Sequence, residues 1–594
     1  MLGPLSAVAA VGLCLASATP PAGHVAVSKT QSGFMLQVDG EPFVIRGAGG
    51  DASKAQLKAA GANAFRTWGI GEDTQAQLDE AHRLGLKVIL GIWLGHERHG
   101  FDYGDPPQVR RQFLQARSAV KRFKDHPALL AWAVGNEMEG FKEGDDPKIW
   151  AAVDAIAKMI KALDPNHPTI SVVAEIGGGR VQALHTRAPH VDIVGINSYG
   201  GAPSLPQRYR AAGGRKPYVV TEFGPPGTWE QPMNDWGVPV EKTSTEKAAI
   251  YGAVYDRLKD DPLCLGSIAF TWGAKQEATA TWFSMFLPDG TRLGAVDALC
   301  TRWSGRPPKN RVPEIAALKI TGPAQVKPSA VIRASLSAKD PEGDPLTVQW
   351  VLYEEMPKFE TGGDARPAPP TFPESILKPS LQDATVRMPV RPGNYRLFAF
   401  VRDDHGGGAI ANLPLKVLGQ APRHLGAATN LPLVVYGDAT SGVPFAPSGY
   451  MGDTISIEMD LKSTTSPRSG PTCLQVDFHR STGWGGVVWQ NPANDWGEEP
   501  GGYALHGAQR LIFWAKGAKG GEKVKFGYGL LKPDKEFHDS SGDEREIELT
   551  SKWARYTFEL KGKNLDRIKS GFFWVVGGQG TPVRFFLDDI RYER

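Results

Sequence analysis

Hydrophobic positions in residues 27–308 form short apolar runs that alternate with segments of helical periodicity. The linking segments, such as TQAQLDEAHRLG, repeat apolar residues near every 3.6 positions. This alternation predicts parallel strands joined by helices, and eight strands in about 280 residues match a (β/α)₈ TIM barrel. The eight runs are FVIRGAGG from Phe43, NAFRTWG from Asn63, KVILGIWLGHE from Lys87, LLAWAVGNE from Leu129, TISVVAEIG from Thr169, DIVGINSYG from Asp192, PYVVTEFG from Pro217 and GSIAFTWG from Gly266.

The pattern changes beyond the proline-rich segment GRPPKNRVPE near Pro307. Residues 312–418 contain short strands with alternating apolar positions, such as DPLTVQWVLY and YRLFAFVRD, and predict an all-β module. The stretch GQAPRHLGAATN is typical of a linker. Strands resume in residues 428–594, where they predict a β jelly roll. The chain is therefore expected to be a multidomain protein.

Composition agrees with several folded domains. A chain of 594 residues is too long for one hydrophobic core, and 41% hydrophobic with 22% charged residues is ordinary for a globular protein. The formal charge is only +3, from 67 basic and 64 acidic residues, and there is no long basic block. Nucleic acid and anionic membrane surfaces are therefore not expected partners, and we expect an uncharged substrate.

The first residues are apolar and small, and Ala16-Ser17-Ala18 fits a signal-peptidase site, so residues 1–18 are predicted to be a signal peptide. The protein is then expected to be secreted or periplasmic. The positive segment that usually opens a signal peptide is missing, and a lipoprotein signal through Cys14 is less favoured because bulky Leu13 precedes it. No later apolar run reaches the roughly 18 residues of a membrane span.

Three cysteines follow the predicted signal peptide, too few for a disulfide-built scaffold or a cysteine-rich zinc site. Cys264 and Cys300 flank the last predicted barrel strand. They could pair in an oxidising compartment or remain two buried free thiols.

Two glutamates end apolar runs of the predicted barrel. Glu137 follows the fourth run and Glu222 ends the seventh. Active sites of this fold lie at the carboxyl ends of the strands, so the closed barrel would bring the two side chains together. A carboxylate pair of this kind is what a retaining glycosidase needs, one group as acid/base and one as nucleophile.

The motifs HPALLAWAVGNE and VTEFG resemble clan A of the glycoside hydrolases, and GFMLQVDGEPFVIRG resembles the start of family 2 and family 5 barrels. The resemblance covers most of residues 34–275. It implies that Glu137 is the acid/base, that Glu222 is the nucleophile, and that Asn136 binds the sugar 2-hydroxyl.

The same resemblance implies roles for four further strand-end residues. Arg66 and Tyr199 would donate hydrogen bonds to the nucleophile, Trp272 would be the platform for the sugar, and His96 would bind a hydroxyl. Tyr199 and Trp272 could each instead be a packing residue.

Other candidates near the two glutamates have weaker signals. Glu139 is expected to bind a hydroxyl or to cap a helix. The loop that contains Trp229 and Glu230 is expected to line the substrate site. The histidines lack the spacing of metal ligands, so no catalytic cofactor is expected.

The two β modules also resemble known domains. The phrases DPEGDPLTVQWVL and YRLFAFVRDDHGG are similar to immunoglobulin-like sandwiches of the polycystic-kidney-disease or cadherin type, which usually serve as spacers. The stretch GWGGVVWQNPANDWG resembles carbohydrate-binding jelly rolls, with Trp484, Trp489 and Trp496 as candidates for glycan stacking or for the core. Asp588 and Asp589 are expected either to hold a structural Ca²⁺ or to cap a turn.

Together these features predict a retaining β-glycosidase acting on a poly- or oligosaccharide, with a β-glucan as the expected substrate. A β-glucan transglycosylase using the same two glutamates is one alternative. A non-catalytic glycan-binding surface protein is another, although the retained glutamate pair argues against it.

Overall fold

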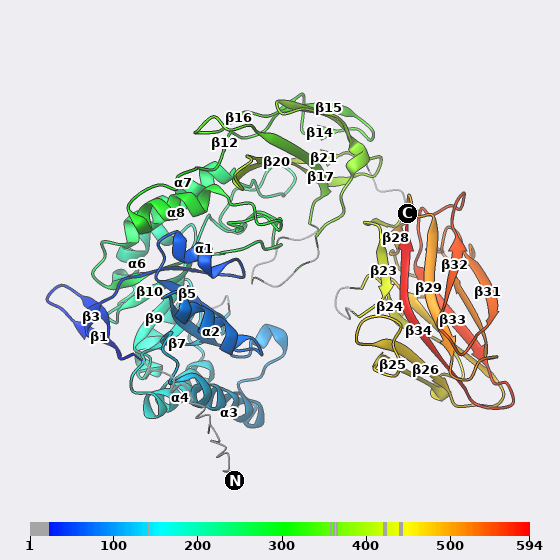
Figure 1. Cartoon of the computed structure of the whole chain (residues 1–594), viewed down its shortest axis with the longest axis horizontal. Coiled ribbons are helices and arrows are strands. Elements are labelled where there is room, and N and C mark those ends of the chain that lie inside the picture. Colours follow the sequence, from blue (N-terminus) through cyan, green and yellow to red (C-terminus); the bar gives the residue numbers. More distant parts are fainter. Residues whose placement is uncertain are drawn as a thin grey trace, which may run out of the picture.

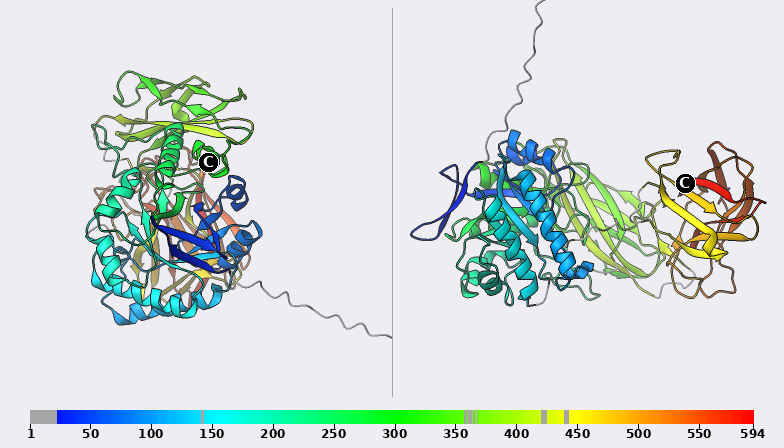
Figure 2. Two further views of the ribbon diagram at one scale, coloured as in Figure 1. Left: turned by 90° about the vertical axis from the view of Figure 1, so that its left-hand side faces the viewer. Right: turned by 90° about the horizontal axis from the view of Figure 1, so that it is seen from below.

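A computed structural model describes residues 23–140, 143–356, 359, 363, 366, 368–419, 425–438 and 443–594. The predicted signal peptide, residues 1–18, lies outside the described residues. Three bodies follow one another along the chain, a barrel, a β-sandwich and a second, larger β-sandwich, with the first sandwich in the middle of the row (Figures 1 and 2).

Eight parallel strands close into a barrel, and each of the eight predicted runs overlaps one of them, so the predicted (β/α)₈ fold is confirmed. The neighbouring order is β10-β11-β4-β5-β6-β7-β8-β9. The strands are β4 (Ile45–Gly49), β5 (Ala64–Arg66), β6 (Lys87–Ile92), β7 (Leu129–Asn136), β8 (Thr169–Ala174), β9 (Ile193–Asn197), β10 (Tyr218–Phe223) and β11 (Cys264–Phe270).

Helices follow the strands and cover the outside of the barrel (Figure 1). Local signals set several of their ends: α7 begins at a capping box of Thr243 and Glu246, and α8 ends at Gly305, which has a φ of 77°. The helices are α1 (Lys54–Ala59), α2 (Thr74–Arg83), α3 (Pro106–Phe123), α4 (Pro147–Leu163), α5 (Arg180–Arg187), α6 (Leu205–Ala211), α7 (Ser244–Leu258) and α8 (Gly294–Ser304).

The amino-terminal end of the barrel is closed by an antiparallel sheet of β1 (Val25–Lys29), β2 (Phe34–Val38) and β3 (Glu41–Pro42). Val25 and Leu36 of this sheet belong to the same buried cluster as inward-facing side chains of the barrel strands. A larger cluster fills the layer between strands and helices. Because the amino-terminal end of the barrel is filled, a functional site is expected at its carboxyl end.

The middle body consists of two facing four-stranded sheets around one buried cluster. One sheet has the order β13-β15-β19-β18 and the other β14-β21-β20-β17. The strands are β13 (Lys319–Thr321), β14 (Gln325–Val326), β15 (Val331–Ser335), β17 (Thr347–Glu354), β18 (Ile376–Pro379), β19 (Asp383–Arg387), β20 (Gly393–Arg402) and β21 (Gly408–Val417), with a short pair of β12 (Glu314–Ile315) and β16 (Ala338–Lys339) beside them.

The last body has two antiparallel sheets, as a jelly roll requires. One sheet contains β23 (Leu433–Tyr436), β25 (Ile457–Ser463), β26 (Cys473–Phe478), β29 (Arg510–Gly517), β32 (Ala554–Glu559) and β34 (Val583–Glu593). The other contains β24 (Ala446–Gly452), β27 (Trp484–Gln490), β30 (Lys523–Tyr528), β31 (Asp543–Glu548) and β33 (Ser570–Gly577), while β22 (Ala427–Ala428) pairs with β28 (Tyr503–Ala504).

Two sequence expectations concern the chain as a whole. Cys264 and Cys300 are both free thiols of intermediate burial, so the disulfide alternative is wrong. Among the described residues, none of the helices combines the length and the apolar character that crossing a bilayer requires.

Candidate active site

The carboxyl ends of the barrel strands surround a cavity of about 520 Å³, within the range of small-ligand sites. Glu137 and Glu222 both line it. The other lining residues are Trp68, Trp93, Asn136, Ala174, Glu175, Asn197, Ser198, Tyr199, Trp229, Glu230, Phe270, Thr271, Lys275, Glu277 and Gly363.

Glu222 lies in β10 and is held by three donors. Tyr199 donates its hydroxyl to Oε2 over 2.7 Å, while Trp68 Nε1 and Arg66 Nη1 donate to Oε1 over 2.7 Å and 2.9 Å. Burial, followed by the charge of Glu222, raises the pKa of Tyr199 well above its ordinary value, so this hydroxyl keeps its proton. These three donors fix the orientation of the Glu222 carboxyl group.

Glu137 follows the last residue of β7 and has a φ of 55°, which is uncommon for a residue with a side chain. Its backbone N–H donates to Val172 O of β8, and this bond fixes the turn out of the strand. Burial and then the charge of Glu222 raise the pKa of Glu137 to about 8. A carboxyl group with such a pKa carries a proton at neutral pH.

A polar network joins the two glutamates. Asn197 Nδ2 donates to Glu137 Oε1 over 2.6 Å and to Asn136 Oδ1 over 3.2 Å. Arg66 donates through Nη2 to Asn136 over 2.7 Å and through Nη1 to Glu222. This network of Arg66, Asn136 and Asn197 therefore fixes the position of the two carboxyl groups relative to each other.

The two carboxyl groups therefore have different chemical environments. Glu222 has a hydrogen-bond donor on each oxygen, the Tyr199 hydroxyl on Oε2 and the charged Arg66 guanidinium on Oε1, as suits a nucleophile. Glu137 has a raised pKa, as suits a general acid. This separation by environment is how one site performs acid and base chemistry at neutral pH.

Arg66 and Tyr199 donate to Glu222 as expected, and Asn136 lines the cavity, whereas two expected placements are wrong. Trp272 is 0% exposed, donates to Ser53 O, and packs against Phe286 and Trp303 rather than facing the cavity. β11 ends at Phe270, so the alternation of a strand no longer holds at Trp272.

His96 is also not among the cavity residues. Its ring is 5% exposed and stacks on Trp93, with ring centroids 4.8 Å apart and planes at 11°. Trp93 is the side chain that reaches the cavity, and it is 46% exposed. His96 therefore supports an aromatic wall instead of meeting a hydroxyl.

The remaining barrel candidates are divided between the cavity and its surroundings. Trp229 and Glu230 line the cavity, as expected for their loop, and Glu230 Oε2 accepts from the backbone N–H groups of Gly200 and Gly227. Glu139 is buried behind the cavity, where it accepts from Arg180 Nε and Ala174 N.

Several cavity residues had not been identified from the sequence. Trp68 lies in the same FRTWG motif as Arg66, and Asn197 in the same NSYG motif as Tyr199, so the strand-end positions could have indicated both. Glu175 directly follows β8 and has a φ of 68°, an uncommon conformation that the sequence does not indicate.

The tryptophan candidates of the jelly roll are not equivalent. Trp489 is 1% exposed and packs in the core against Phe572, so its expected role in glycan stacking is wrong. Trp484 is 50% exposed at the start of β27, and Trp496 lies beyond the other end of that strand. The rest of β27 therefore lies between these two candidates along the chain.

Asp588 and Asp589 already have protein donors. Asp588 Oδ2 accepts from the backbone N–H groups of Arg468 and Ser469, and Asp589 Oδ2 accepts from the Arg468 guanidinium and the Ser469 hydroxyl. An arginine at this position does not fit a Ca²⁺ site, and the contacts correspond to the turn-capping alternative.

Comparisons with known proteins agree with the barrel. Residues 55–224, which include both glutamates, match the family "Glycosyl hydrolases family 2, TIM barrel domain". The chain is 25% identical over 347 residues to a rice protein named "Putative mannan endo-1,4-beta-mannosidase 9", covering 42% of this chain and 82% of that protein. It is 29% identical over 208 residues to human β-glucuronidase, covering 30% of this chain and 28% of the enzyme.

Among solved structures, the endo-β-1,4-mannanase of Thermotoga petrophila aligns with this chain at 14% identity and a TM-score of 0.33. That alignment covers 64% of this chain and 98% of the mannanase. The chain thus spans most of the rice relative but only 28% of the length of human β-glucuronidase. The closed barrel with its strand-end carboxylates therefore matches the TIM barrel domain of glycosyl hydrolase family 2 over residues 55–224, and two β modules follow it along the chain.

Proposed function

We propose that this protein is an exported retaining β-glycosidase that acts on a neutral poly- or oligosaccharide. The observation that carries the proposal is the contrast between the two carboxyl groups. Three donors hold the carboxyl group of Glu222, and Glu137 has a pKa raised to about 8. A retaining mechanism requires one group of each kind.

In the proposed reaction Glu222 attacks the anomeric carbon while Glu137 gives its proton to the leaving glycosidic oxygen. The C–O bond to the leaving group breaks and a glycosyl ester forms on Glu222. Glu137, now ionised, then removes a proton from water, which attacks the same carbon and releases Glu222. The hydrogen bonds from Tyr199 and Trp68 hold Glu222 in place for the attack.

Charges around the cavity favour a neutral sugar over a uronic acid. Among the described cavity residues, Lys275 is the basic side chain, and its Nζ lies 2.9 Å from Glu277. Glu175 is paired with Arg208 at 2.9 Å, and Glu230 is held by backbone N–H groups. A uronate would meet carboxylates and a cation that is already paired.

The relatives include enzymes for both kinds of sugar, since the rice protein is named a mannosidase and the human one a β-glucuronidase. The charge pattern favours a neutral β-hexoside, for which β-glucan and β-mannan are the substrates to test first. Transglycosylation is the second candidate, because Trp93 and Trp229 are about half exposed at the cavity and offer stacking surfaces for an acceptor sugar.

The test is a panel of aryl β-glycosides and of glucan, mannan and glucuronide oligosaccharides, with product analysis to separate hydrolysis from transfer. We expect turnover of neutral β-hexosides by the wild type and by Glu230→Gln, and none above background by Glu222→Gln. A 2-fluoro glycosyl donor should label the peptide that contains Glu222. Label on another residue, or equal inactivity of all three proteins, would refute the proposal.

Export is tested separately, by the amino-terminal sequence of the protein recovered outside the cytoplasm. We expect mature protein that begins at Thr19, after the signal peptide predicted from residues 1–18. Protein that stays in the cytoplasm with residues 1–18 intact would contradict this part of the proposal.

A further inference from the structure

The middle β-sandwich meets the barrel beside the cavity. Two barrel loops lie at this junction, residues 224–243 after β10 and residues 271–284 after β11. Trp229 of the first loop and Thr271, Lys275 and Glu277 of the second line the cavity. Their positions therefore depend on what holds the loops.

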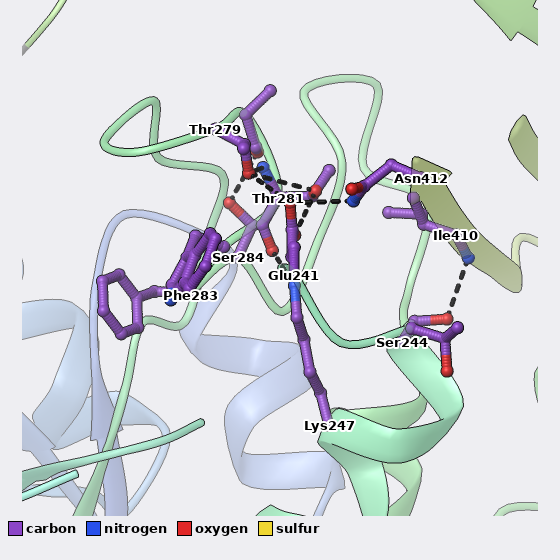
Figure 3. Close-up of polar contacts among 12 residues, drawn as sticks. Glu241, Ser244, Lys247, Thr279, Thr281, Phe283, Ser284, Ile410 and Asn412 are labelled. Atoms are coloured by element: carbon purple, nitrogen blue, oxygen red, sulfur yellow. Dashed lines mark hydrogen bonds and ion pairs between the residues drawn. The ribbon is translucent and has the colours of Figure 1, made fainter. Parts of the chain in front are cut away.

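Glu241 links the two loops. Its Oε2 accepts from Thr279 Oγ1 over 2.8 Å, and its Oε1 accepts from Thr281 Oγ1 over 2.7 Å. Lys247 of α7 pairs with the same carboxylate and also donates to Thr281 O over 2.7 Å. Figure 3 shows Glu241 at the centre of these contacts, between the threonines of the second loop and Lys247.

The sandwich completes this cluster from the opposite side. Asn412 of β21 donates through Nδ2 to Glu241 Oε2 over 2.8 Å, and its Oδ1 accepts from Arg396 Nη1 over 2.8 Å. Arg396 of β20 also donates to Pro239 O of the first loop over 2.9 Å and to Glu355 Oε2 over 2.8 Å. The sandwich thus contacts Glu241 and the backbone of its loop.

The cluster is buried and balanced in charge. Glu241 is 6% exposed, Arg396 1% and Asn412 9%. Burial acts to raise the pKa of Glu241, but the positive charges of Lys247 and Arg396 outweigh it and lower that pKa. Two ion pairs lie at the junction, one between Lys247 and Glu241 and one between Arg396 and Glu355. Removing one member would leave a buried polar group without its partner.

The sandwich also contributes to the cavity wall itself. Phe359 packs against the aromatic cluster of Phe270, Trp282 and Phe283. Phe283 lies 5.0 Å from Tyr199 between ring centroids, and Tyr199 donates to Glu222. Gly363 lines the cavity, and a side-chain carbon there would lie 3.2 Å from Lys275 Nζ.

We propose that the middle sandwich is a working part of the active site rather than a spacer. Asn412 and Arg396 are positioning residues that hold the loops after β10 and β11, and Phe359 packs against the aromatic residues that support the cavity wall. This inference rests on the proposed glycosidase function. It assigns to the sandwich the binding of sugar units that lie against Trp229, Lys275 and Glu277.

The interface provides a matched control. Arg402 of β20 also crosses from sandwich to barrel, where it donates to Asp289 Oδ2 over 2.8 Å, but Asp289 lies in a turn away from the cavity residues and the pair is partly exposed. Asn412→Leu and Arg402→Gln both remove a contact between the two domains. Only Asn412→Leu removes one that reaches the cavity loops.

The experiment compares wild type, Asn412→Leu, Arg402→Gln and Phe359→Ala on aryl β-glycosides and on cellohexaose, laminarihexaose and mannohexaose. We expect Asn412→Leu and Phe359→Ala to raise KM for the cleaved hexasaccharide about tenfold or more, because small displacements of binding groups have large effects. Their kcat on the aryl glycoside should stay within about threefold of the wild-type value, and Arg402→Gln should match the wild type on both substrates.

Titration calorimetry of the same hexasaccharide on the Glu222→Gln background gives a readout independent of turnover, and Kd should rise about tenfold with Asn412→Leu. Phe359→Ala keeps the test valid if Asn412→Leu does not fold. If wild type cleaves a hexasaccharide and these variants behave like Arg402→Gln, the inference fails while the proposed function stands. If wild type cleaves nothing, the proposed function itself fails.

Discussion

Asn197 donates its side-chain amide to Oε1 of Glu137 over 2.6 Å. This hydrogen bond favours the ionised form of the acid, whereas burial and the charge of Glu222 favour the protonated form and prevail, raising its pKa to about 8. The pKa of Glu137 therefore depends on opposing contacts, and substitutions can remove these contacts one at a time.

The first prediction concerns the pH profile of the wild type. Glu137 must be protonated to act as the acid, so kcat/KM should be held up to about pH 8 and fall about tenfold per pH unit above it. The measurement is kcat/KM against pH on a substrate with a poor leaving group. A profile that falls instead above about pH 5 would contradict the raised pKa.

Removing the amide donor of Asn197 should shift the alkaline limb, the fall of kcat/KM at high pH, to a higher pH. In Asn197→Ala the hydrogen bond that favours the ionised acid is lost, so the pKa of Glu137 should rise and the alkaline limb should shift to higher pH. Activity should also fall, but the test is the pH at which activity declines on the alkaline side, not the maximal activity. An unchanged limb would show that Asn197 does not influence the acid.

Removing a neighbouring charge should move the limb in the opposite direction. After burial and Glu222, the charge of Glu139 also acts to raise the pKa of Glu137. Glu139→Gln keeps an acceptor for Arg180 and Ala174, and the alkaline limb should shift to lower pH by a fraction of a unit, roughly 0.5. Exposed Glu143→Gln serves as the control and should leave the profile unchanged.

The two oxygens of Glu222 should respond differently to loss of a donor. Tyr199 is the donor to Oε2, whereas Oε1 has both Trp68 and Arg66. A hydrogen bond to a charged group is worth about 1.5–3 kcal/mol, so Tyr199→Phe should lower kcat/KM about 10- to 150-fold. Trp68→Phe should cost less, because Arg66 remains on the same oxygen. The reverse order would contradict this division of roles.

Two tryptophans near the barrel mouth should affect different properties. Buried Trp272 stabilises the layer beside α8, so Trp272→Phe should lower the free energy of unfolding by about 1–3 kcal/mol without changing KM. Trp229 is 48% exposed in the cavity, so Trp229→Ala should raise KM about tenfold without changing Tm. Thermal unfolding and initial rates measured on the same samples separate the two.

The jelly roll allows a similar comparison. Trp489→Ala should destabilise this body by about 3–5 kcal/mol, because it removes a buried indole from the core. Exposed Trp484→Ala should change stability by less than about 0.5 kcal/mol. If Trp484 stacks on glycan, its loss should also weaken retention on an insoluble polysaccharide. Equal stability losses in the two variants would contradict the assigned burial.

The sequence by itself determined the barrel and the two glutamates. Parallel strands buried on both faces must be continuous apolar runs, and such runs are visible without knowing what they contact. Their ends mark where side chains leave the core, which is why the predicted contacts of Arg66 and Tyr199 with Glu222 were found.

Only the tertiary structure decided what lies just beyond each strand. Trp272 turns outward and His96 stacks behind Trp93, because the alternation of side chains stops where the strand stops. Burial also separated Trp489 from Trp484, which the sequence presents as equals on one strand. The link from Asn412 to Glu241 joins residues 171 positions apart. No local pattern encodes such a contact, because its partners become neighbours only when two domains dock.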